Sequence, residues 1–178
     1  GHVEHALHVV DDGSTTWITV EPGTAADVAG WLDSMRFMLR VEVADVTDRY
    51  AVLATTAAPP HPVEGVARWV DPWPAIEDGA LVGDTAAYGP VDDHPGVGWS
   101  LTELVVERSA LEGLAAREDI AWAGVLALEA LRIAAWRPRL GAETDHRTIA
   151  HEVDWLRTAV HLNKGCYRGQ ETIARVHN

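Results

Sequence analysis

Proline is concentrated in the middle of this 178-residue chain, and this limits the regular structure that can form there. Seven of the nine prolines lie between Pro59 and Gly98. Proline lacks a backbone N–H and fixes φ, so it interrupts helices and the interior strands of sheets. We therefore expect loops and short strands in this stretch, with a boundary between about Pro59 and Pro74. This predicts two lobes, about 1–58 and about 75–178, joined by a Pro-rich segment.

The N-terminal residues carry the signals of a β-hairpin. Apolar and β-branched residues fill 3–10 and 16–20, and the turn sequence Asp11-Asp12-Gly13-Ser14 separates them. Strand-forming runs on either side of such a turn predict two antiparallel strands.

A helix and two further strands are expected after the hairpin. Thr24, followed by Asp27 and by apolar residues at helical spacing, predicts a helix that begins there and ends before Val41. Short strand-forming runs follow at 41–46 and 50–55. The order of elements up to this point is β-α-β-β.

The last part of the chain adds a strand and a long helix. Residues 101–106 predict a strand, Ser109 is a candidate helix cap, and 120–136 predicts a helix that Pro138 helps to end. Strands and helices mixed in this order favour an α+β fold of ferredoxin-like β-α-β-β-α-β units. The apolar residues that share one face of the expected long helix are Trp122, Val125, Leu126, Ile133 and Trp136.

Composition excludes several classes of function. Fourteen Lys and Arg against 27 Asp and Glu give a formal net charge of −13, which opposes non-specific attraction to nucleic acid or to anionic lipid. No apolar run approaches the length of a membrane span. One cysteine cannot form an internal disulfide, so we expect a cytoplasmic protein. From the charge and the lack of an apolar span we expect neither a nucleic-acid nor a membrane partner.

The single cysteine lies in an unusual octapeptide, Lys164-Gly165-Cys166-Tyr167-Arg168-Gly169-Gln170-Glu171. Thiol chemistry requires the thiolate, and the cations Lys164 and Arg168 would stabilise its negative charge. The two glycines allow a tight turn or a close approach to a ligand. The alternative interpretation is a small buried thiol between turn residues.

This octapeptide resembles the K-G-C-Y-x-G-Q-E signature of the YgfZ-type folate-binding proteins, relatives of the glycine-cleavage T-protein (aminomethyltransferase). The resemblance continues through 131–141 and 152–156, and more loosely covers nearly the whole chain. It implies the aminomethyltransferase folate-binding fold with a folate-sized central cavity. It also implies that 1–178 is a central fragment, which in the family would be flanked by an N-terminal portion and a C-terminal β-barrel.

The resemblance implies a tetrahydrofolate-binding protein that assists the assembly or repair of iron–sulfur clusters in client enzymes. Its implied partners are folate and the iron–sulfur client or assembly proteins. Cys166 and Lys164 are the candidate catalytic residues. No stably bound metal is expected, because one thiolate cannot supply the roughly four ligands that a cluster needs. The candidate folate contacts are Arg137, Tyr167, Arg168, Gln170, Glu171 and Glu129.

One departure from the aminomethyltransferases concerns catalysis. Their catalytic Asp-Asp pair aligns with the strand Val3-Glu4-His5-Ala6-Leu7, where His5 and Ala6 replace it. A neutral imidazole cannot supply the negative charge of a carboxylate beside a cationic folate nitrogen. Glu4 is a poor substitute, since adjacent strand residues point to opposite faces. Glycine-cleavage activity is therefore not expected, although a folate-dependent one-carbon transferase or demethylase is kept as an alternative, as is a non-catalytic partner-binding domain.

A second departure concerns folate itself. Many relatives carry a pterin-binding glutamate near the end of the long helix, where this chain has Ala134. Glu129 lies on the apolar face about one turn earlier and either contacts a ligand or pairs with Arg132, three residues on. Arg137 and Arg139 are candidates for holding the glutamyl carboxylates of a folate, or else are ordinary solvated arginines.

Histidines and tryptophans give weaker signals. The spacing of the histidines in the last third does not match a zinc site, and a Cys-His pair between Cys166 and His161 or His177 remains an alternative to surface or structural roles. Three tryptophans of the Pro-rich region either stack against a flat ligand or fill small cores under loops. They are Trp69, Trp73 and Trp99.

Overall fold

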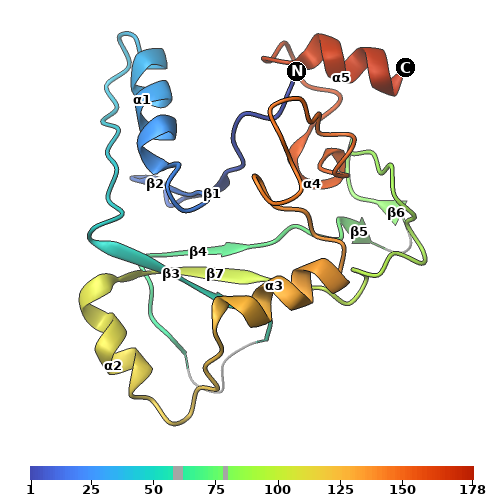
Figure 1. Ribbon diagram of the computed structural model, residues 1–178. Coiled ribbons are helices and arrows are strands. Elements are labelled where there is room, and N and C mark those ends of the chain that lie inside the picture. The colour runs from blue at the N-terminus through green and yellow to red at the C-terminus, as the bar shows by residue number, and fades with distance from the viewer. Residues whose placement is uncertain (58–61, 78–79) are drawn as a thin grey trace. The chain divides into compact units, whose positions relative to one another are not determined.

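Residues 1–57, 62–77 and 80–178 are described by the computed structural model, and they form an α+β fold with antiparallel sheets. Contacts between Cα atoms divide the chain into two compact units, each assembled from separate stretches. Unit 1 comprises 1–4, 71–100 and 123–178, and unit 2 comprises 5–70 and 101–122. Figure 1 labels the elements of both units.

Unit 2 begins with the hairpin that the sequence predicts, formed by β1 (His8–Asp11) and β2 (Thr16–Thr19). Two side chains close its turn. The Asp11 carboxylate accepts a hydrogen bond from the Gly13 N–H at 2.8 Å, and the Asp12 carboxylate accepts from the N–H groups of residues 14 and 15. The hairpin is therefore specified locally.

Helix α1 (Ala25–Met35) follows the hairpin and begins after Thr24, as predicted. The Thr24 hydroxyl bonds back to the Glu21 carbonyl at 2.9 Å instead of capping the helix. Val28 is the buried residue of this helix, which places its inner face.

A three-stranded antiparallel sheet forms the rest of unit 2, in the order β3-β7-β4. Its strands are β3 (Tyr50–Thr55), β4 (Ala67–Val70) and β7 (Thr102–Glu107), with α2 (Leu111–Ala115) after a 3₁₀ turn at Arg108–Ala110. Consecutive residues of a strand point to opposite faces. Val105 and Val106 are both buried, so both faces of the central strand are covered.

Unit 1 holds the remaining elements. Its strands β5 (Ile76–Glu77) and β6 (Ala80–Leu81) form a short ribbon, and its helices are α3 (Val125–Ala134), α4 (Leu156–Ala159) and α5 (Gln170–His177). No helix among the described residues is long and apolar enough to span a membrane. The buried apolar side chains of this unit are Trp73, Ala135, Val153, Leu156 and Ile173.

Two of the expected strands differ from the structure. Residues 41–46 do not form a strand, because among the described residues β3 pairs only with β7 and leaves this run without a partner. An Asp45 side-chain bond to the Thr47 N–H instead starts a turn there. The first strand covers His8–Asp11 and not 3–10, since β2 offers only four residues for pairing.

The expected helix over 120–136 is shorter, and its inner face is not the expected one. It begins at Val125 after the extended Gly124, and ends at Ala134, before Trp136 takes a φ of 52°. The predicted apolar face, which includes Leu126 and Ile133, is exposed, whereas Arg132 is buried. The ion pairs of Arg132, described below, draw the opposite face inward. Ser109 is not a cap, because it lies inside the 3₁₀ turn.

Candidate functional site

The centre of unit 1 is the indole of Trp73, which carries two guanidinium groups against its ring. The Cζ atoms of Arg137 and Arg157 lie 4.3 and 4.4 Å from the ring centroid. The indole N–H donates to the Gly96 carbonyl at 2.8 Å. Cations over an aromatic face are attracted by the ring quadrupole, and the attraction strengthens away from water. This Trp73 cluster therefore fixes the loop 71–75 to the helical part of the unit.

Asp71 is the anion that balances this cluster. Its buried carboxylate accepts hydrogen bonds from Arg137 at 3.0 Å, from the Trp99 indole N–H at 3.0 Å and from the Trp73 backbone N–H at 3.0 Å. A buried carboxylate is tolerated only when it is paired and hydrogen-bonded. Asp71 meets that condition through three different segments of the chain.

His94 packs against the same indole as a neutral ring. Its Nδ1 accepts a hydrogen bond from the Gly96 N–H at 2.9 Å, which requires an unprotonated Nδ1. Burial, followed by the charge of Arg157, lowers the pKa of His94 below its usual 6.5, against a smaller opposing effect of Asp154. Gly96 has no alternative at this place, since a Cβ would lie 2.6 Å from the Ala135 carbonyl oxygen.

Arg157 is fully buried and forms an ion pair with Asp154 at 2.6 Å. Its Nη2 also donates to the Pro90 carbonyl, while Nη1 has no hydrogen bond and is stabilised by the indole face of Trp73. The second oxygen of Asp154 accepts from the Tyr88 N–H at 2.8 Å. The pair thus ties α4 to the loop 88–90.

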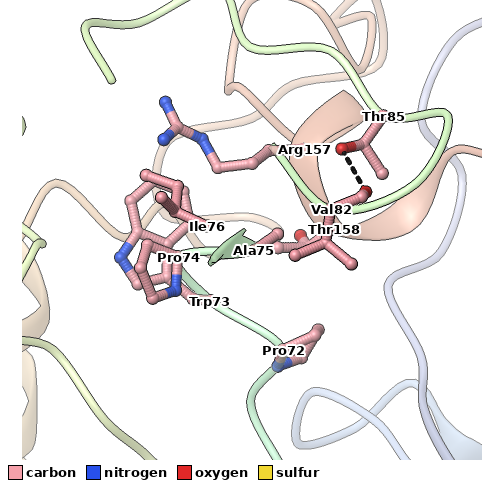
Figure 2. Close-up of a pocket in the computed structure, with 9 residues that line it drawn as sticks. All are labelled: Pro72, Trp73, Pro74, Ala75, Ile76, Val82, Thr85, Arg157 and Thr158. Atoms are coloured by element: carbon pink, nitrogen blue, oxygen red, sulfur yellow. Dashed lines mark hydrogen bonds between the residues drawn. The ribbon is translucent and has the colours of Figure 1, made fainter. Parts of the chain in front are cut away.

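A pocket of about 400 Å³ opens beside Trp73 and Arg157. Figure 2 shows the side chains that surround it, with the Thr85 hydroxyl bonded to the Val82 carbonyl at 3.0 Å. Its volume is within the range of small-molecule sites, and its wall is largely apolar. The lining residues are Pro72, Trp73, Pro74, Ala75, Ile76, Val82, Thr85, Arg157 and Thr158.

The octapeptide forms an exposed loop that leads directly into α5. Cys166 is exposed to solvent. The Lys164 amine lies 5.0 Å from the ring centroid of Tyr167, and Arg168 pairs with Glu4 at 2.9 Å. Both cations that the sequence places beside the thiol therefore have partners of their own. Gly169 precedes the helix with a φ of 87°, a conformation that favours glycine.

The remaining octapeptide residues belong to the first turn of α5. Gln170 is its first residue, and its N–H bonds back to the Tyr167 carbonyl at 3.1 Å. Glu171 pairs with Arg175 one turn later, with both side chains exposed. These contacts stabilise the helix and fix the C-terminal end of the loop to its first turn.

The segment that leads into the octapeptide passes beside the pocket. Thr158, in the last turn of α4, lines the pocket, and the Leu162 N–H donates to the Asp84 carbonyl at 3.2 Å. Asp84 lies between the lining residues Val82 and Thr85. A ligand in the pocket would therefore contact Thr158, eight residues before Cys166 in the chain.

Glu129 has the arginine partner that its spacing predicts. Its carboxylate bonds Arg132 at 2.7 Å and also contacts Arg139, while Arg132 reaches Glu143 at 2.8 Å. Hydrogen bonds from Arg132 and then from Arg139 lower the pKa of Glu129 to about 2, despite partial burial. This ion-pair network is separate from the residues that line the pocket.

The other sequence candidates make separate contacts within their own units. His5 belongs to unit 2, where its ring is 6.4 Å from that of Trp31, and Glu4 belongs to unit 1 through Arg168. Within the part of the chain that the structure describes, no hydrogen bond joins Cys166 to a histidine. His177 bonds Tyr88 instead, at 3.2 Å. The same part of the chain holds no group of three metal-ligating side chains.

Sequence reasoning missed Asp71, His94 and Arg157. Asp154 and Arg157 have the three-residue spacing of helical ion pairs, but Asp154 precedes α4 with a φ of 55°, so this pair is not a helical one. Nothing local marks Asp71, because its partner Arg137 lies 66 residues away. The cluster is a tertiary feature, and only the fold brings it together.

Models of known protein families, curated protein sequences and solved structures were compared with this chain, and none matches it.

Proposed function

We propose that this chain is a tetrahydrofolate-binding protein that assists the assembly or repair of iron–sulfur clusters, with Cys166 as its reactive group. The observation that carries the proposal is the connection between the octapeptide loop and the pocket. Thr158 lines the pocket, and the N–H of Leu162, two residues before the octapeptide, donates to the carbonyl of Asp84, which lies between the lining residues Val82 and Thr85. We infer that a ligand bound in the pocket would change the position of Cys166 through this segment.

Two features of the pocket support a flat, pterin-like ligand. It is walled by apolar side chains and by Trp73, and flat ligands favour such surfaces. Arg137 is already bonded to Asp71 and stacked on Trp73, so a role in binding folate carboxylates would require it to exchange partners. Thr85 and Thr158 are the hydroxyl groups that line the pocket and could orient polar ring atoms.

In this proposal Cys166 contacts an iron–sulfur cluster transiently and does not hold one permanently. It is exposed, and one thiolate falls short of the ligand set that a stable cluster needs. A partner enzyme or scaffold would supply the other ligands during transfer or repair. Lys164 contributes a positive charge on the same loop, although its amine also faces Tyr167.

We also propose a specific fold for this chain, the aminomethyltransferase folate-binding fold. The α+β architecture with antiparallel sheets is compatible with ferredoxin-like units of the aminomethyltransferase folate-binding type. The carboxylate next to the replaced catalytic position, Glu4, is paired with Arg168. This pairing disfavours a one-carbon transfer reaction that relies on a free carboxylate there.

Calorimetric titration with tetrahydrofolate tests the binding part of the proposal. We expect the chain to bind, and Val82→Trp, which fills the pocket, to abolish binding. Val125→Trp adds the same bulk to an exposed position that does not line the pocket and should bind as the unsubstituted chain does. No binding by the unsubstituted chain would refute the folate proposal, and unchanged binding by Val82→Trp would move the folate site away from this pocket.

Reactivation of an oxidised [4Fe–4S] enzyme tests the cluster part. Cys166→Ser should retain tetrahydrofolate binding but lose the ability to accelerate reactivation. If Cys166→Ser is as effective as the unsubstituted chain, the thiol has no role in cluster maintenance and Cys166 is structural.

A further inference from the structure

Helix α5 is held to the rest of unit 1 by few contacts. Ile173 is its buried side chain, His177 bonds the Tyr88 hydroxyl at 3.2 Å, and the residue before its N-cap, Arg168, pairs with Glu4. Figure 1 shows the N-terminus beside the start of this helix, where a Cβ on Gly169 would lie 3.4 Å from the Gly1 Cα. An eight-residue helix cannot persist alone in water, so these contacts determine whether α5 stays formed.

Beneath these contacts lies His151, which is only 6% exposed. Its ring meets the Tyr88 ring edge-on, with centroids 4.9 Å apart, and Tyr88 in turn contacts the His177 ring. Neither ring nitrogen of His151 makes a hydrogen bond of normal geometry. A neutral imidazole can be buried in this way, but an imidazolium would be a buried charge without a partner.

No side chain that faces His151 supplies a negative charge to balance an imidazolium, among the residues that the structure describes. His177 of α5 adds a like charge when it is protonated, and the Tyr88 ring, nearly perpendicular to that of His151, carries no charge. Asp154, on the same segment as His151, is committed to Arg157 and to the Tyr88 N–H. Burial and His177 therefore oppose protonation of His151 more strongly than the Ile173 backbone of α5 favours it.

The pKa of His151 agrees with this geometry. Burial, and then the charge of His177, lower it below its usual 6.5, against a smaller opposing effect of a hydrogen bond to the Ile173 backbone. The neutral ring favours the docked helix, and the released state binds a proton more readily. Docking is therefore strongest above about pH 6.5 and weakens as the pH falls from there toward the lowered pKa.

We propose that His151, Tyr88 and His177 form an acid-sensitive latch that releases α5, and with it the loop that carries Cys166. The C-terminal anchor of this loop is Gly169 at the start of α5, while Leu162 remains bonded to Asp84 at the other end. Release of α5 frees the loop at one end only. The inference stands on contacts outside the pocket and does not depend on folate binding.

Because Cys166 is the single cysteine of the chain, a thiol-reactive label can be attached to the loop at one defined position. A nitroxide spin label on Cys166 reports the mobility of the loop through its electron paramagnetic resonance line shape. We expect the mobile component to rise about twofold or more, reversibly, between about pH 8 and about pH 5.5. His151→Phe keeps an aromatic ring against Tyr88 without a titratable group, and should abolish this rise. The matched control is His161→Phe, an exposed histidine of the same loop, which should leave the rise intact.

Two results would overturn the latch: a line shape that does not change with pH, or a His151→Phe protein that retains the full pH dependence. Tyr88→Phe supplies an independent measurement if His151→Phe does not fold. It keeps the ring contact with His151 but loses the bond to His177, so release should occur at higher pH than in the unsubstituted chain. Release at an unchanged pH would contradict the proposal.

Discussion

The guanidinium of Arg157 lies over the indole of Trp73, 4.4 Å from the ring centroid, and the arginine side chain is completely buried. The same guanidinium neutralises Asp154 at 2.6 Å. Arg157→Met keeps much of the side-chain volume but leaves Asp154 without its cation. Removing one partner of a buried pair costs about 3–5 kcal/mol, and we expect a loss of unfolding free energy near the lower end, about 3 kcal/mol, because Asp154 is partly exposed.

Urea denaturation followed by tryptophan fluorescence measures this loss. Arg175→Met is the matched control, since Arg175 forms an exposed pair with Glu171 on α5. Its effect should stay within about 0.5 kcal/mol. Equal effects of the two substitutions would show that burial of Arg157 does not contribute as described.

Glu129→Gln tests the ion-pair network of α3. At neutral pH the substitution should lower stability, because Arg132 and Arg139 lose a carboxylate partner. The pKa of Glu129 is lowered from 4.5 to about 2, so its contribution is complete above about pH 4.5 and is lost as the pH falls toward 2. The stability difference between the two proteins should therefore shrink over that interval. Urea midpoints at a series of pH values give the comparison.

Glu171→Gln serves as the control for this pH series, because both side chains of the Glu171–Arg175 pair are largely exposed. It should change stability little at any pH. A difference for Glu129→Gln that stays constant down to pH 2 would mean that the carboxylate is not held by its arginines.

The two glycines of the octapeptide should respond differently to alanine. Gly169 has a φ of 87°, whereas Gly165 has no such constraint and a Cβ there would meet nothing within 4 Å. Gly169→Ala should cost roughly 1–2 kcal/mol, because an L-residue disfavours the left-handed region. Gly165→Ala should be nearly neutral. Hydrogen exchange of the α5 amides measures both, and equal protection in the two variants would contradict this interpretation of Gly169.

Two glycines of unit 2 should also respond differently to alanine. A Cβ on Gly65 would come 2.7 Å from the backbone oxygen of Val105, next to the β4–β7 pairing. Gly65→Ala should therefore destabilise the protein, by about 1–3 kcal/mol. Gly30 lies exposed within α1 with open space around it, so Gly30→Ala should stabilise by about 0.5–1 kcal/mol. Thermal unfolding distinguishes the two, and a stable Gly65→Ala protein would disprove the close contact.

Local features of the fold could be predicted from the sequence. The hairpin follows from the Asp11 and Asp12 turn, whose hydrogen bonds reach at most three residues along the chain. The strands at 50–55 and 101–106 were recognised individually, but their pairing joins Tyr50 to Glu107 and has no local signature. The run 41–46 has the same composition as a strand and lacks only a partner. Pattern alone cannot supply that information.

The candidate site also has a part that the sequence reveals and a part that only the fold reveals. The octapeptide could be recognised because its eight residues are contiguous, whereas the Trp73 cluster joins residues whose side chains meet only in the fold. The orientation of α3 was predicted wrongly because an apolar face normally turns inward. Here Arg132 is buried through its ion pairs with Glu129 and Glu143, and hydrophobicity alone does not predict this orientation.

The interleaving of the two units determines the order in which they can be completed during synthesis. A ribosome has made every residue of unit 2 once it reaches Trp122, including the strand β7 that joins β3 to β4. Residues 1–4 and 71–100 have then already been translated, but they must wait for 123–178 before Trp73 can meet Arg137 and Arg157. A nascent chain of this protein would therefore carry Asp71 without its arginine partner until Arg137 is made, and Trp73 without its second guanidinium until Arg157 is made.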